Sequence, residues 1–305
     1  MLALLSCEAL SGDYNKALPA AAAVELIYDF VQVHGEVQAG MSDSPDRPSI
    51  WWVWGPAQAI NAGDGLHAMA RLTVMRLSER DVPAERVLRA VQALDRACLA
   101  VCEGQYMDLS FQEQPLVASG LYYDMIQRKT GSLTGCSAEL GALAAGVSDE
   151  VCGSFRETGR KLGMAWQITQ DIADLWGYRG DGMTVSNVLN KKKGLPVVYT
   201  LENASVSTKR ELGTIYMKRV LEPDDVGRIV AILDQANARQ YAEGKARELV
   251  EQAVELLGDT GVATDGVEAF RRLGVLALER PTAVHTRPLL PRTGDLPGRP
   301  DAAGI

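Results

Sequence analysis

The stretch 166–176 contains the residues whose types and spacing are best suited to chemistry. If it is helical, Gln167, Gln170, Asp171 and Asp174 lie about one turn apart and share one face. Carboxylates stacked on one helix face are hard oxygen ligands of the kind that Mg²⁺ uses to hold a phosphate group. The alternative is an ordinary solvated acidic stripe, and the two aspartates alone favour that alternative.

Two cationic stretches could supply complementary groups for a phosphate. Lys191, Lys192 and Lys193 are consecutive and form a compact positive cluster on an otherwise acidic chain. Lys129 interrupts a long run rich in Ala, Leu and Gly. The lysine cluster could clamp a phosphate beside the aspartates or could simply keep a loop soluble, whereas a lone lysine such as Lys129 is usually a surface residue.

The elements that must position these residues are predicted to be helices. Apolar residues recur at three- and four-residue spacing, and period-two alternation is nearly absent. The predicted helices span 16–40, 58–80, 84–109, 117–147, 150–177, 194–203, 206–221 and 223–258. Their length and their content of Ala and Gly favour one large all-α bundle around a central cavity over residues 1–280. Five prolines within the last 25 residues predict a disordered tail over 281–305.

Composition excludes several classes of protein. Of the 305 residues, 47% are hydrophobic and 23% are charged, which permits a sizeable core. The net charge of −8 argues against sequence-independent nucleic-acid binding. No apolar run is long enough to span a membrane, and the N-terminal stretch lacks the basic region of a secretory signal. Five cysteines without metal-ligand spacing predict buried reduced thiols, and the sequence therefore predicts a cytoplasmic protein.

Taken together, these motifs resemble those of the trans-isoprenyl diphosphate synthases, the polyprenyl synthetase family, over roughly residues 1–260. The matching segments keep the family's order and spacing and span 21–34, 51–64, 104–108, 129–131, 163–174 and 192–198. The resemblance implies an all-α bundle, usually a homodimer, in which two aspartate-rich helices face each other across a deep cavity. There Mg²⁺ ions hold an allylic prenyl diphosphate, whose ionisation gives a carbocation that isopentenyl diphosphate attacks.

The first aspartate-rich motif of that family is largely absent. Where the family has Asp-Asp-x-x-Asp, this chain has Gly35, Glu36 and Ala39, so Glu36 is the one possible metal ligand left. Two consecutive arginines that grip isopentenyl diphosphate in the family align with Ser44 and Pro45. The chain also begins after the family's basic N-terminal loop, which serves the same subsite. These losses predict that no condensation with isopentenyl diphosphate occurs.

The allylic half of the family's site is better kept. Gln170 and Asn187 replace aspartates, but Asp171 and Asp174 remain. The resemblance implies that Asp171, Asp174 and Glu36 bind Mg²⁺, and that Asp171 and Asp174 act in catalysis together with Lys192. It assigns binding of the substrate diphosphate to four side chains, Lys129, Thr130, Gln167 and Lys192. Replacing Asp171 by Asn is expected to slow the reaction about a hundredfold with little effect on folding.

Three interpretations are consistent with this pattern. The favoured one is a class I terpene cyclase-like enzyme that ionises a single C15 or C20 prenyl diphosphate with Mg²⁺, without chain elongation. Phe30 and Trp166 would then face the cation in the cavity. The second is a catalytically silent subunit that pairs with an active prenyl diphosphate synthase. The third, a chain-elongating synthase, would need a replacement ligand, and Asp29 lies about 10 Å from Glu36 along the helix axis. A homodimer, or a heterodimer with a related synthase, is expected.

Overall fold

The structure is a computed structural model that describes residues 1–39, 49–177, 187–258 and 260–279. Its regular elements within these ranges are all helical, which confirms the all-α prediction. The predicted tail over 281–305 lies outside the described residues. In chain order the elements are α1 (Leu2–Ser11), η1 (Tyr14–Ala17), α2 (Leu18–Ala39), α3 (Ile50–Trp54), α4 (Pro56–Met75), η2 (Arg76–Arg80), α5 (Ala84–Glu113), α6 (Ser119–Ile126), η3 (Gln127–Gly131), α7 (Ser132–Ala145), α8 (Asp149–Trp176), α10 (Leu195–Asn203), α11 (Val206–Tyr216), α12 (Pro223–Gln235), α13 (Ala238–Glu255) and α14 (Thr264–Leu278).

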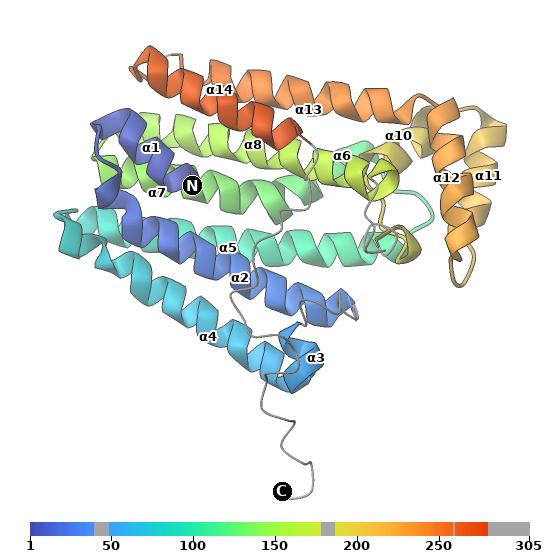
Figure 1. The fold of residues 1–305 in the computed structure, drawn as a ribbon, viewed down its shortest axis with the longest axis horizontal. Coiled ribbons are helices and arrows are strands. Elements are labelled where there is room, and N and C mark those ends of the chain that lie inside the picture. Colours follow the sequence, from blue (N-terminus) through green and yellow to red (C-terminus); the bar gives the residue numbers. More distant parts are fainter. Residues whose placement is uncertain (40–48, 178–186, 259, 280–305) are drawn as a thin grey trace, which may run out of the picture.

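The long helices are stacked in layers, as Figure 1 shows. α8 packs against α13 on one side and against α7 on the other, α7 contacts α1 and α5, and α2 packs on α4. α11 and α12 lie together at one end of the molecule (Figure 1). The C-terminal ends of α5 and α8 point toward that end, where α10 also begins. The bundle therefore brings three chain segments that are far apart in sequence to one place.

The core is aliphatic, as the low aromatic content predicts. α7 lies at its centre, because every residue from Gly135 to Ala144 is buried. Close approach of α8 to α7 depends on Gly163, where a Cβ atom would lie 1.9 Å from the Thr134 hydroxyl oxygen. All five cysteines are free; four are buried, as predicted, and Cys102 is exposed.

Four predicted helices consist of more than one element in the structure: 16–40 begins in η1, 58–80 ends in η2, and two others change inside their span. The predicted helix over 223–258 is interrupted between α12 and α13, because Asn237 adopts the left-handed conformation with φ 54°. The predicted helix over 117–147 consists of α6, η3 and α7, and η3 is a turn of π-helix. α1 and α14 lie where the apolar spacing predicts no helix. Among the described residues, no helix is long and apolar enough to cross a membrane.

Candidate active site

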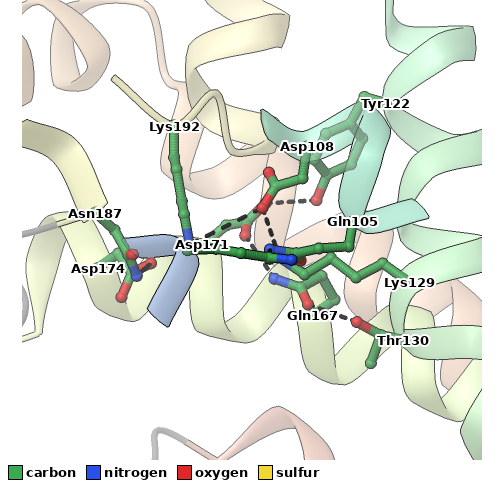
Figure 2. Close-up of polar contacts among 11 residues, drawn as sticks. Gln105, Asp108, Tyr122, Lys129, Thr130, Gln167, Asp171, Asp174, Asn187 and Lys192 are labelled. Carbon is green, nitrogen blue, oxygen red and sulfur yellow. Dashed lines mark hydrogen bonds and ion pairs between the residues drawn. The ribbon is translucent and has the colours of Figure 1, made fainter. Parts of the chain in front are cut away.

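A pocket lies where the C-terminal halves of α5 and α8 meet η3 and the residues before α10, and Figure 2 shows its polar side chains. The structure gathers most of the predicted site residues in its wall, namely Lys129, Gln167, Asp171, Asp174 and Lys192. Other chain segments add further polar side chains to the same wall, namely Asp108, Tyr122 and Asn187.

Lys129 reaches the pocket from η3, where the π-helical turn over Gln127–Gly131 changes the direction of side chains within a helical run. α5 packs directly on this turn at Gly104, where a Cβ atom would lie 2.3 Å from the Lys129 backbone nitrogen. The Lys129 ammonium donates to Asp108 at 2.6 Å, and the Lys192 ammonium lies 3.9 Å from the same carboxylate oxygen. Two cations from different segments therefore converge on one carboxylate of α5.

The charges of these three groups are coupled. Burial raises the pKa of Asp108, but the ammonium groups of Lys129 and Lys192 outweigh it and hold that pKa below its usual range. Burial lowers the pKa of Lys192, and repulsion from Lys129 adds to this effect, against the attraction of nearby carboxylates. Because two ammonium groups share one carboxylate, the cluster has positive charge to offer an anion that enters the pocket.

Asp171 ends a chain of hydrogen bonds that begins at Thr130. The Thr130 hydroxyl donates to the Gln167 side-chain oxygen at 2.6 Å, and the Gln167 amide donates to Asp171 Oδ1 at 3.0 Å. Asp171 Oδ2 accepts from the Tyr122 hydroxyl at 2.5 Å and from the Leu195 backbone N–H at 2.9 Å. Burial raises the pKa of Asp171, and these hydrogen bonds oppose that rise. Since α10 begins at Leu195, Asp171 also satisfies a free N–H at the start of that helix.

Asp174 lies about one turn beyond Asp171 and accepts a hydrogen bond from the Asn187 side-chain amide at 2.7 Å. Within the part of the chain that the structure describes, no group of three or more His, Cys, Asp or Glu side chains could hold a metal ion. Mg²⁺ often binds through one or two carboxylates together with substrate phosphates and water. Asp174 and Asp171 fit that reduced role because both line the pocket, although Asp171 already accepts three hydrogen bonds.

Four of the predicted residues are not in the wall of this pocket, and one of them, Thr130, lies behind it and donates to Gln167. Glu36 lies near the end of α2, which reaches the site through a hydrogen bond of 2.8 Å from the Gln105 amide to Gln38, but Glu36 itself does not line the pocket. Phe30 packs against the rings of His34 and His67, with centroids 4.7 and 5.5 Å away. Trp166 is on α8 and is 39% exposed. Their predicted roles at a metal or a carbocation stay predictions.

The family resemblance and the observed pocket differ at four residues. Two residues that matter in the resemblance lie outside the described part of the chain, and two residues of the pocket were not predicted to act there. Ser44 and Pro45, which align with the family's arginines, lie outside the described residues. Asp108 and Tyr122 are central to the pocket, yet sequence spacing assigns them no polar role. The signal for Asp108 is its place in the matched segment 104–108. For Tyr122 the sequence offers none, because a tyrosine among apolar residues resembles an ordinary core residue.

Comparison with known proteins identifies the family. The family model described as polyprenyl synthetase matches residues 1–233. The chain belongs to the polyprenyl synthetase family. It is 35% identical over 261 residues to a geranylgeranyl diphosphate synthase of Mycobacterium tuberculosis, which covers 85% of this chain and 73% of that protein. A geranylgeranyl pyrophosphate synthase of Geoglobus acetivorans is also 35% identical, over 254 residues that cover 83% of this chain and 77% of that protein.

Solved structures of the polyprenyl synthetase family share the fold. A geranylgeranyl pyrophosphate synthetase from Pyrococcus horikoshii Ot3 matches with a TM-score of 0.82 and 29% identity, over 92% of this chain and 84% of that chain. A polyprenyl synthetase from Streptomyces coelicolor A3(2) matches with a TM-score of 0.82 and 27% identity, over 90% and 82%. The predicted isoprenoid synthase-like bundle is therefore confirmed.

These relatives correct the predicted activity. Geranylgeranyl diphosphate synthases lengthen a prenyl chain, so the prediction of a single-substrate terpene cyclase is wrong. That prediction relied on lost ligands in one motif, whereas the similarity extends over most of the chain. Membership of a polyprenyl synthetase family supports the prediction of an enzyme, and polyprenyl synthetases use Mg²⁺.

Proposed function

We propose that this chain is a chain-elongating prenyltransferase, which transfers an allylic prenyl group from its diphosphate to isopentenyl diphosphate. The observation that carries the proposal is the convergence of Lys129 and Lys192 on one pocket with Gln167, Asp171 and Asp174. The names of the relatives, which are synthases of prenyl diphosphates, support this class of reaction.

Lys129 and Lys192 would bind the diphosphate of the allylic substrate. Asp108 holds both ammonium groups at the pocket wall before substrate arrives, so little reorganisation is needed. When the allylic carbon–oxygen bond breaks, its electron pair moves to the diphosphate. Fixed positive groups stabilise that developing charge, and loss of one such contact typically costs about a hundredfold in rate.

The remaining polar residues would orient the substrate. Both ends of the Gln167 amide are engaged, by Thr130 and by Asp171, so its direction is fixed. Asp174 and Asp171 would hold Mg²⁺, which supplies further positive charge to the leaving diphosphate. The double bond of isopentenyl diphosphate then provides the electrons of the new carbon–carbon bond, and one proton is lost from the product.

A second candidate is a catalytically silent subunit that pairs with an active synthase. One observation favours it: Glu36, the single possible ligand of the first motif, is not in the pocket wall, and Asp171 is engaged in three hydrogen bonds. Such a chain would keep the fold and the polar network without turning over substrate.

The two candidates are separated by incubation with Mg²⁺, radiolabelled isopentenyl diphosphate and a C10, C15 or C20 allylic diphosphate. Label in a longer prenyl product supports elongation, and Lys192→Met should then reduce the rate about a hundredfold. Lys16→Met, at an exposed position outside the pocket, is the control for loss of charge. No label with any substrate, together with altered product length when an active synthase is added, supports the silent subunit.

We also propose that the chain pairs through α4 and α5, either with itself or with a related synthase. Large apolar side chains of these two helices are exposed, among them Met69, Leu72, Met75, Leu88 and Leu99. α4 contacts α5, and apolar side chains exposed over adjoining helices are a feature of protein interfaces. Light scattering at micromolar concentration tests the proposal, and a monomer without a co-purifying partner would contradict it.

A cytoplasmic location also stays a proposal. Its support is the set of five free cysteines, which suits a reducing compartment. Cell fractionation tests it, and recovery of the protein outside the cytoplasmic fraction would contradict it.

A further inference from the structure

Three consecutive lysines precede α10, and each has a different partner. Lys191, whose backbone has a left-handed φ of 59°, donates from its ammonium to the Lys218 carbonyl oxygen. Lys192 points into the pocket (Figure 2). Lys193 is only 3% exposed, and its ammonium donates to the Phe111 carbonyl oxygen at 2.6 Å. The three lysine side chains therefore have three different environments: a main-chain carbonyl beyond α11, the pocket, and the end of α5.

The partner of Lys193 is the end of α5. Phe111 and Gln112 belong to the last turn of that helix, where carbonyl groups carry partial negative charge, and the Phe111 oxygen also accepts from the Gln114 N–H at 3.3 Å. The Lys193 ammonium lies 2.6 and 3.4 Å from these two carbonyl oxygens and 5.4 Å from the centre of the Tyr216 ring. A buried ammonium with carbonyl and aromatic partners acts as a fixed anchor, unlike a mobile surface charge.

The chain around Lys192 is thereby held on its C-terminal side at two points. Lys193 is tied to α5 through Phe111, and the Leu195 N–H is tied to a carboxylate of α8. Asp108, which lies 3.9 Å from the Lys192 ammonium, is three residues before Phe111 and hence on the same face of α5. The anchor of Lys193 and the reach of Lys192 are therefore set against one turn of the same helix.

We infer that Lys193 is a positioning residue, which sets where the Lys192 ammonium meets a bound diphosphate. The inference rests on the diphosphate-binding role of Lys192 in the proposed function, but it does not depend on which reaction follows. Without the Lys193 ammonium, the segment that carries Lys192 loses its hydrogen bonds to the main chain of α5. Lys192 would then spend less time in the position where it contacts a phosphate.

The test compares Lys193→Met, Lys193→Arg and Lys191→Met in the full chain. Met has a similar length but no donor, whereas Arg keeps a cation that can reach the carbonyl oxygens of α5. Lys191→Met is the matched control, because it removes an equal charge two residues away without touching α5. Titration calorimetry with inorganic diphosphate and Mg²⁺ measures the dissociation constant. Amide hydrogen exchange over 190–196 measures mobility, and circular dichroism checks each fold.

We expect Lys193→Met to weaken diphosphate binding about tenfold and to speed amide exchange over 190–196, and Lys193→Arg to recover most of the affinity. Lys191→Met should change the affinity less than about twofold. Should the Met variant unfold, Lys193→Gln, which keeps one donor and loses the charge, is compared with Lys193→Arg instead.

Several results would overturn the inference. Faster exchange without weaker binding would make Lys193 a purely structural anchor, and unchanged exchange or an equal loss of affinity in Lys191→Met would remove its special role. Failure of the unaltered chain to bind diphosphate would overturn both the inference and the proposed site. A chain that shows all the expected effects yet incorporates no isopentenyl diphosphate would refute elongation alone and leave the role of Lys193 intact.

Discussion

Replacing Asp171 by Ala removes the acceptor for the Tyr122 hydroxyl and for the Leu195 N–H, and both of these residues are fully buried. A buried donor that loses its partner costs about 1–3 kcal/mol. Two such donors, at about 2 kcal/mol each, predict a loss of about 4 kcal/mol in the free energy of unfolding. Because a globular domain has only about 5–15 kcal/mol in total, this single change should remove a large fraction of the stability.

Asp174→Ala is the matched control, since it removes a carboxylate from the next turn of α8. Asp174 accepts from the Asn187 side chain at the pocket, and a hydrogen bond of that kind is worth about 1 kcal/mol. Urea unfolding followed by circular dichroism and tryptophan fluorescence measures both losses. The Asp171 variant should unfold at a much lower urea concentration than the Asp174 variant.

The reasoning is refuted if Asp171→Ala costs less than about 1 kcal/mol, or if the two variants lose the same stability. Asp171→Asn provides a second check, because the amide keeps the shape and one acceptor oxygen and should cost less stability than Ala. If the Asp171 carboxylate also binds Mg²⁺, that variant should lose about a hundredfold in rate. Full activity of the Asn variant would exclude Asp171 from the metal site.

Gly104→Ala should push α5 away from the Lys129 backbone and lower the free energy of unfolding by about 1–3 kcal/mol. Gly244→Ala, whose added Cβ atom meets no atom within 4 Å, should instead raise it by about 0.5–1 kcal/mol. Equal melting temperatures of the two variants would contradict this. Burial lowers the pKa of Lys193 to about 8, so between that pH and the unfolded value of about 10.4 the unfolded chain binds a proton that the folded chain has released. The free energy of unfolding should therefore rise with pH in this window, by roughly 2 kcal/mol between pH 7 and 10 relative to Lys193→Met, and parallel pH profiles of the two proteins would speak against it. Asn237→Ala should cost about 1 kcal/mol in urea unfolding, because Ala is penalised in the left-handed conformation; an unchanged midpoint would show that this backbone conformation matters little.

Most helices of the bundle could be predicted from the sequence because a buried helix face repeats every three or four residues. The same signal does not report backbone conformation. A left-handed residue such as Asn237 divides α12 from α13 while the apolar spacing continues across it. The π-helical turn of η3 is hidden for the same reason, since Gln127–Gly131 lie in a stretch whose apolar pattern reads as one helix.

The site could be predicted as a set of residues, but the partners of each residue could not. Lys129, Lys192 and the two aspartates of α8 were recognisable from their types and from the family's spacing. The sequence also predicted that replacing Asp171 would have little effect on folding. The structure instead engages it with Tyr122 and Leu195, which are 49 and 24 positions away in the chain. Contacts over such distances follow from the packing of helices and leave no trace in local spacing.

The incorrect prediction of a terpene cyclase has a similar cause. It gave most weight to substitutions at a few positions after His34, where ligand types are lost. The class of reaction is better predicted from sequence similarity over the whole helical bundle. The two relatives at 35% identity match 83–85% of this chain. The loss of a metal ligand changes one subsite, whereas the reaction takes place in a cavity that the whole bundle forms.

The π-helical turn at Gln127–Gly131 makes the pocket depend on the number of residues in the chain as well as on their types. A π turn holds one residue more than an α-helical turn. Deleting a single residue there would allow α6 and α7 to join as one continuous α-helix in nearly the same relative orientation, because five residues of a π turn and four residues of an α-helix rotate the chain by a similar angle. The buried faces of α6 and α7 would keep their positions, but side chains within the turn, Lys129 among them, would point in a different direction. A homologous chain one residue shorter at this point would carry the same Lys-Thr motif and present it to a different part of the molecule, so alignments of this family need to be gapped at η3 before residues around it are equated.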